Sequence, residues 1–322
     1  MQSRRTLVCL AAASAALAAA AAARAAPSAS SYPRRQVSFL INDGVFHSIR
    51  DPQAFHPAQP LSPALLDRML AAIPGTRPVV LGTGRLTVAG VDAAFVEALG
   101  LRGVAADVAR GLRAAGLQPG AAAGLEVVAR NLGLRHNYPA ALDARERLPG
   151  DTAIRMDGAY ATWKVLREQG WEQSYVHDKL AGLWIPPVPA AVHDVLQRAV
   201  SEIGSPYVWA GGSLEDGGFD CSGLVLYALG GDESWLGGRT THDWARAHRK
   251  DRLGPDDLEA GDVLLFGRRG RRSRPGQVDH TALYLGNGWF IDSASQGVSL
   301  DRLDTGYYAK RFAFALRPPR ST

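Results

Sequence analysis

Apolar residues recur at helical spacing through the first third of the chain. After an irregular, proline-containing lead-in, Ser62 provides an N-cap and Pro63 suits the first helical position. Further apolar periodicity predicts helices over 91–99 and 104–115. We therefore expect residues 26–123 to form an irregular and helical region. The first helix is marked by Leu65, Leu66, Met69, Leu70 and Ile73.

Short runs rich in β-forming residues follow between residues 124 and 185. Glycines separate these runs, which is typical of a small barrel. Trp163-Lys164-Val165 and Gly170-Trp171 through Tyr175-Val176 resemble the bacterial SH3-like domain of exported cell-wall proteins. We therefore predict an SH3-like barrel over 124–185, followed by a stiff proline linker over 186–189. The predicted strands are 125–128, 152–156, 161–166 and 174–176.

The pattern changes again after the linker. One apolar helix face runs from Val192 to Ile203, and Gly204 ends the helix. Strand-like runs then predict an antiparallel sheet, so residues 190–322 form a second domain and the fold class is α+β. The predicted strands are 262–266, 281–285, 289–291, 297–300 and 312–316.

Composition limits the class of protein. The chain has 322 residues, 46% hydrophobic and 21% charged, which excludes extensive disorder and a multi-pass membrane protein. Two cysteines exclude a disulfide scaffold. No CxxC, HExxH or EF-hand pattern is present, so we predict no metal site and no cofactor.

The first 25 residues have the pattern of an export signal. Arg4 and Arg5 precede an apolar, alanine-rich run from Thr6 to Ala23, and cleavage after residue 23 or 25 fits. Removing Arg4, Arg5 and Arg24 changes the net charge from +5 to 5 − 3 = +2, too small a surplus for a nucleic-acid-binding surface. We therefore expect an exported protein of the periplasm or cell envelope, without a stable membrane span. A retained anchor is the alternative, and a general or a twin-arginine signal remains open.

Export leaves Cys221 as the one cysteine of the mature chain. Such a residue is either a tolerated buried side chain or a reactive thiol. It follows the Gly217-Gly218 turn, where an apolar, helix-competent run begins. Unpaired N–H groups at a helix start favour a thiolate and can stabilise an oxyanion.

A thiolate needs a proton acceptor, and His280, at the start of a predicted strand, is the best candidate. His242 and His248 are rivals in a polar, arginine-rich stretch. A two-residue Asn287-Gly288 turn would place Asp292 on the face opposite His280. A three-residue loop would pair position 282 with 292 and place Asp292 beside the histidine. Both registers fit the sequence, and only the second makes a Cys-His-Asp triad.

Four motifs follow one another along the chain, at residues 204–209, 219–224, 258–263 and 280–288. In this order they resemble the NlpC-type cysteine peptidases, which are papain-like cell-wall hydrolases. The resemblance covers residues 190–317 and implies that Cys221 is the nucleophile, His280 the base and Asp292 the third polar residue. Aspartate departs from the histidine, asparagine or glutamine usual there, and Ala210 replaces a usual glycine. The resemblance also implies that Tyr207, Asp220 and Ser222 contact substrate or shape the site. An N-cap carboxylate is the alternative for Asp220.

The resemblance implies an endopeptidase that cleaves peptidoglycan stem peptides, most often between D-glutamate and the diamino acid. An SH3-like domain ahead of such a catalytic domain is expected to wall off the groove. Two alternatives stay open: an acyltransferase or amidase, and a wall-binding protein with a degenerate catalytic domain. The basic run from Arg268 to Arg274 is a solvated loop or a site for anionic wall polymers. The oligomeric state stays open.

Overall fold

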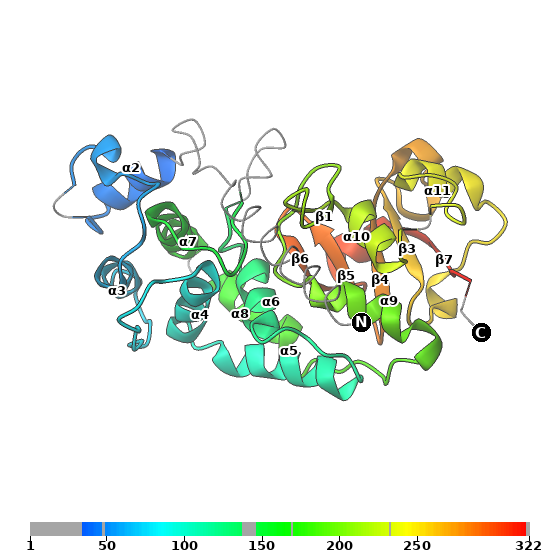
Figure 1. Cartoon of the computed structure of the whole chain (residues 1–322), viewed down its shortest axis with the longest axis horizontal. Coiled ribbons are helices and arrows are strands. Elements are labelled where there is room, and N and C mark those ends of the chain that lie inside the picture. Colours follow the sequence, from blue (N-terminus) through cyan, green and yellow to red (C-terminus); the bar gives the residue numbers. More distant parts are fainter. Residues whose placement is uncertain (1–33, 47–48, 137–145, 169, 232, 320–322) are drawn as a thin grey trace, which may run out of the picture.

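The computed structural model describes residues 34–46, 49–136, 146–168, 170–231 and 233–319 (Figure 1). The predicted export signal lies outside these residues. No helix in the described ranges is both long enough and apolar enough to cross a membrane.

Helices fill the first half of the described chain, and helices mixed with strands fill the second (Figure 1). The helices of the first half are α2 (Arg34–Asn42), α3 (Pro63–Ala71), α4 (Val88–Ala98), α5 (Arg102–Ala114), α6 (Ala123–Asn131), α7 (Arg155–Glu168) and α8 (Trp171–Leu180), with the 3-10 turn η2 (Pro52–Phe55). The second half contains α9 (Ala190–Ser201), α10 (Cys221–Ala228), α11 (Thr241–Ala247), α12 (Gly306–Arg311) and the 3-10 turns η4 (Pro255–Asp257), η5 (Gly270–Arg272) and η6 (Pro275–Gln277). Its strands are β1 (Gly212–Ser213), β2 (Gly218–Phe219), β3 (Val263–Gly267), β4 (Val278–Gly286), β5 (Trp289–Ala294), β6 (Gly297–Arg302) and β7 (Phe312–Leu316).

The first predicted helices are confirmed. Ser62 caps α3, where its hydroxyl accepts the Leu65 N–H at 3.3 Å, and Pro63 opens the helix. The predicted helices at 91–99 and 104–115 correspond to α4 and α5. Local capping and apolar periodicity therefore sufficed for these elements.

The predicted SH3-like barrel over 124–185 is wrong, because α6, α7 and α8 occupy that segment. Apolar runs of four to six residues fit a strand or a buried helix turn equally well. Gly158, expected in a turn, lies inside α7, where an added Cβ would come within 2.8 Å of Met69 Sδ. Its small size allows close helix packing rather than chain reversal. Gly170, with φ +85°, does form the break between α7 and α8.

The C-terminal half contains the predicted antiparallel sheet, in the order β6-β5-β4-β3-β7. The α+β class is therefore confirmed. Helix α10 contacts β4 and β5, and α11 contacts β4. Because β4 lies at the centre of the sheet, residues at its start are held rigidly next to the helices that cover it.

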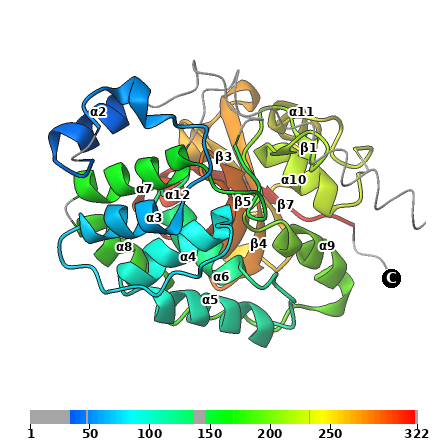
Figure 2. The same cartoon turned by 60° about the vertical axis from the view of Figure 1, so that its left-hand side comes forward.

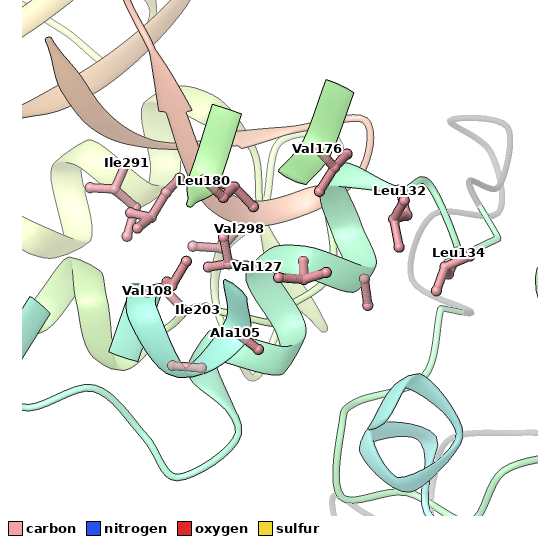
Figure 3. Close-up of a cluster of buried hydrophobic side chains, with 14 of the residues drawn as sticks. Ala105, Val108, Val127, Leu132, Leu134, Val176, Leu180, Ile203, Ile291 and Val298 are labelled. Carbon is pink, nitrogen blue, oxygen red and sulfur yellow. The ribbon is translucent and has the colours of Figure 1, made fainter. Parts of the chain in front are cut away.

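One hydrophobic core joins the two halves. Val127 of α6 and Leu180 of α8 lie in the same buried cluster as Ile291 of β5 and Val298 of β6 (Figure 3). Figure 2 shows the N-terminal helices gathered beside the sheet. Burial of this shared apolar surface stabilises a single packed unit in which the helices cannot move freely away from the sheet.

A buried arginine adds polar links across the same boundary. The Arg130 guanidinium of α6 donates to the carbonyls of Gly204 and Gln296, and to Glu146 at 3.1 Å. Gln296 lies in the turn between β5 and β6. A helix of the N-terminal region therefore fixes a turn of the C-terminal sheet.

Candidate active site

Helix α10 begins at Cys221, as the sequence predicted. Asp220 is the N-cap, and its carboxylate accepts the Gly223 N–H at 2.6 Å and the Ser222 hydroxyl at 2.9 Å. Cys221 is half-buried and forms no disulfide. An added Cβ at Gly223 would lie 1.9 Å from the Gly211 carbonyl oxygen, so glycine is required there. Close packing of this first turn against the preceding loop holds the thiol at the helix start.

The β4–β5 hairpin combines features of both predicted registers. Its turn is the two-residue one, with Gly286 opposite Trp289, and Asn287 has φ +50°. The register then shifts by one residue, so that Tyr284 lies opposite Phe290. This β-bulge, with Leu285 as the extra residue, reverses the facing that the two-residue turn alone would impose. Asp292 therefore lies on the same face as His280.

His280 and Asp292 form a direct ion pair. His280 Nε2 lies 2.6 Å from Asp292 Oδ2, and the Asp292 side chain is completely buried. Tyr308 of α12 donates its hydroxyl to the same carboxylate oxygen at 3.1 Å. Since Nε2 is engaged by Asp292, Nδ1 is the ring nitrogen left for the thiol.

The protonation of His280 reflects its two neighbours. Burial lowers the pKa of His280, but hydrogen bonds to Asp292 and Cys221 and the negative charges of both outweigh burial and raise the pKa to about 10. The ring is therefore positively charged at neutral pH. A cationic imidazole next to Cys221 favours the thiolate, which is the form that attacks carbonyl carbon.

A groove of about 1140 Å³ contains both Cys221 and His280. Its opposite wall comes from the N-terminal region, with Tyr160 and Lys164 of α7 and Tyr175 and Lys179 of α8. The predicted barrel was expected to wall off the groove; in its place, helices line it.

The predicted substrate-binding residues have different positions. Tyr207 lines the groove, whereas Asp220 and Ser222 are not among its lining residues. Both of the latter contact Arg239, whose guanidinium lies 3.3 Å from Asp220 Oδ1 and 2.5 Å from Ser222 Oγ. Arg239 also donates to the carbonyl of Ala210, whose φ of +63° is a conformation that glycine adopts more easily. This arrangement agrees with the N-cap alternative for Asp220.

The rival histidines lie elsewhere, and neither lines the groove. His242 is exposed in α11, and the ring of His248 packs at a tilt against Trp235 with ring centroids 4.8 Å apart. In the basic run, Arg268 pairs with Asp279 at 3.1 Å. Arg269, Arg271 and Arg272 border a separate pocket of about 660 Å³.

Sequence reasoning missed Tyr308 and Arg239. Both lie 16 to 19 residues along the chain from the side chains they contact, in short segments without a motif, so no local signal marked them. Among the residues that the structure describes, no group of three or more His, Cys, Asp or Glu side chains is arranged to hold a metal ion.

Comparison with known proteins agrees with the resemblance drawn from the motifs. Residues 204–317 match the model of the NlpC/P60 family. Probable endopeptidase YafL of Escherichia coli (strain K12) is 36% identical over 124 residues, covering 38% of this chain and 48% of that protein. Murein DD-endopeptidase MepH of the same strain is 30% identical over 164 residues, covering 48% and 59%.

A solved structure is also similar. The peptidoglycan hydrolase RipB from Mycobacterium tuberculosis is 32% identical, with 40% of this chain and 68% of that chain covered and a TM-score of 0.31. The chain spans about half the length of the curated relatives that it matches.

Proposed function

We propose that the NlpC/P60 domain formed by residues 204–317 is a cysteine endopeptidase acting on peptidoglycan stem peptides. The observation that carries this proposal is the contact of His280 with both Cys221 and Asp292, at the start of α10. The names of MepH and of RipB, a murein and a peptidoglycan endopeptidase, support the substrate class. We further propose that the protein is exported to the periplasm or cell envelope.

The geometry supports the following reaction. The Cys221 thiolate attacks the peptide carbonyl carbon, which forms a C–S bond and an oxyanion that backbone N–H groups at the start of α10 would stabilise. His280 then gives its Nδ1 proton to the leaving amine as the C–N bond breaks. Water, deprotonated by His280, attacks the thioester and releases the acid and the thiolate.

The bond between D-glutamate and the diamino acid is the proposed cleavage site. Mass spectrometry of muropeptides after incubation with the protein tests this directly, because each cleaved bond gives products of different mass. An acyl product joined to a second amine would favour the acyltransferase alternative. Binding without any new product would favour the wall-binding alternative, although the Cys221–His280 contact argues against it.

Metal chelation should leave the activity unchanged. The proposed nucleophile is a side-chain thiolate and needs no metal-bound water. Hydrolysis measured with and without EDTA checks this expectation. Activity lost to EDTA and restored by zinc would contradict the mechanism.

The helical wall should restrict the choice of substrate. Tyr175 of α8 lines the groove and is 49% exposed, so Tyr175→Ala opens that wall. We compare kcat/KM for N-terminally blocked or longer peptides with kcat/KM for peptides that have a free N-terminus. The ratio of the first to the second should rise about fivefold, since one aromatic contact contributes about 1 kcal/mol. A point substitution is preferable to removing the helices, because the core is shared between the halves.

Trp184→Ala is the matched control for Tyr175→Ala. Trp184 is 57% exposed and does not line the groove. An unchanged substrate ratio in Tyr175→Ala, equal to that of Trp184→Ala, would assign the helices a role other than selectivity.

A further inference from the structure

The carboxylate of Asp292 is buried, and the His280 ring is the cation that balances its charge. Its Oδ2 accepts from His280 and Tyr308, and its Oδ1 has no hydrogen-bond partner among the described residues. Among the residues that the structure describes, Asp292 forms its ion pair with His280. The stability of the charged form of this buried carboxylate therefore depends strongly on its two donors, His280 and Tyr308.

Tyr308 is held so that its hydroxyl points at this carboxylate. Its ring packs edge-on against Phe290, with centroids 4.9 Å apart, and against Phe266 at 5.2 Å. Its side chain is almost completely buried, and its centroid is 6.0 Å from that of the His280 ring. Aromatic packing on several sides therefore fixes the direction of the hydroxyl.

We propose that Tyr308 is a positioning residue of the active site, whose hydroxyl limits how strongly Asp292 stabilises the protonated ring of His280. This inference rests on the proposed function of the site. A hydroxyl dipole offsets part of the carboxylate charge, whereas a lysine or arginine in its place would cancel that charge and remove the attraction for the imidazolium.

The hydroxyl remains a donor throughout the working range of pH. Burial and the charges of Asp292 and Asp301 hold the pKa of Tyr308 well above its usual value. Asp301 of β6 is the other carboxylate facing this group, and Lys179 of α8 pairs with it at 2.7 Å. Tyr307, the neighbouring residue of α12, also interacts with Tyr308.

The bond matters most when His280 has given its proton to the leaving amine. At that point Asp292 loses its cationic partner, while the Tyr308 hydroxyl still donates to it. Without this hydroxyl the carboxylate would raise the proton affinity of the His280 ring further. His280 would then be a poorer acid toward the leaving group.

The test is the rate of Cys221 alkylation by iodoacetamide as a function of pH, in the full chain and in Tyr308→Phe. In the variant the Asp292 carboxylate is less neutralised and acts more strongly on His280, which favours the protonated imidazole. We expect the alkaline limb, which reports loss of the His280 proton, to move to higher pH by about one unit. We also expect kcat for stem-peptide hydrolysis to fall about tenfold with little change in KM.

Tyr284→Phe is the matched control. The Tyr284 hydroxyl accepts the Gly288 N–H at 2.9 Å in the same sheet and does not touch Asp292, so the alkaline limb should not move. In an Asp292→Asn background, Tyr308→Phe should shift this limb much less, because the charge that the hydroxyl offsets is gone. The inference would be overturned if Tyr308→Phe and the unmodified protein had the same alkaline limb and the same kcat.

A measurement on the unmodified protein covers the case in which Tyr308→Phe does not fold. The Tyr308 hydroxyl proton is donated to a buried carboxylate, so it should exchange with water slowly enough to give a resolved NMR resonance. Rapid exchange with water would overturn the inference. Failure of the proposed function is distinguishable, because Cys221 of the unmodified protein would then alkylate like an ordinary thiol.

Discussion

Replacing Cys221 with alanine is expected to lower stem-peptide hydrolysis by at least about a thousandfold, because no other group can form the thioester. His280→Ala should cause a loss of similar size, since nucleophile and base act as one unit. Mass spectrometry of muropeptides measures the loss. Circular dichroism should show an intact fold for both variants, because Cys221 and His280 lie on the groove rather than in the core.

His242→Ala is the control for the histidine variant. It removes an exposed imidazole of α11 that does not line the groove, so activity should be retained. Undiminished hydrolysis in Cys221→Ala would remove the proposed mechanism outright. Loss in His242→Ala equal to that in His280→Ala would reopen the choice of base.

Asp292→Ala is expected to reduce kcat by about a hundredfold. The change removes the acceptor for both His280 Nε2 and the Tyr308 hydroxyl and leaves two donors unpaired in a buried site. The His280 ring would also lose the partner that fixes its orientation and tautomer. Steady-state kinetics on a defined stem peptide measures the loss.

Asp292→Asn separates orientation from charge. The amide oxygen can still accept from both donors, so we expect a loss of no more than about tenfold. The charge that helps to raise the pKa of His280 to about 10 would be absent. In the unmodified protein the imidazolium is present up to about that pH. In the variant it should be lost at lower pH, so the alkaline limb of the pH profile of kcat should move to lower pH. An unchanged alkaline limb of the pH profile in Asp292→Asn would show that the Asp292 charge does not act on His280.

Helix periodicity and capping predicted α3, α4, α5 and α9 because these signals lie within a few residues. The same reasoning failed for α6, α7 and α8, where apolar runs are short and Gly158 mimics a turn. A glycine is needed there because the side chains of Met69 in α3 and of Leu61 just before α3 approach it, which no local pattern reveals. The error therefore arose where tertiary packing, rather than local preference, selects the residue.

Local signals were enough to predict that Cys221 opens a helix and that His280 lies near the start of a strand, since a Gly-rich turn, an N-cap aspartate and an apolar run act over short range. They did not show that Asp292 faces His280, because a one-residue β-bulge inverts the side of the sheet on which Asp292 lies. The tertiary structure decided this, and it also decided that α7 and α8 wall the groove and that Tyr308 reaches Asp292. These contacts join segments far apart in the chain, and they depend on how the shared core packs.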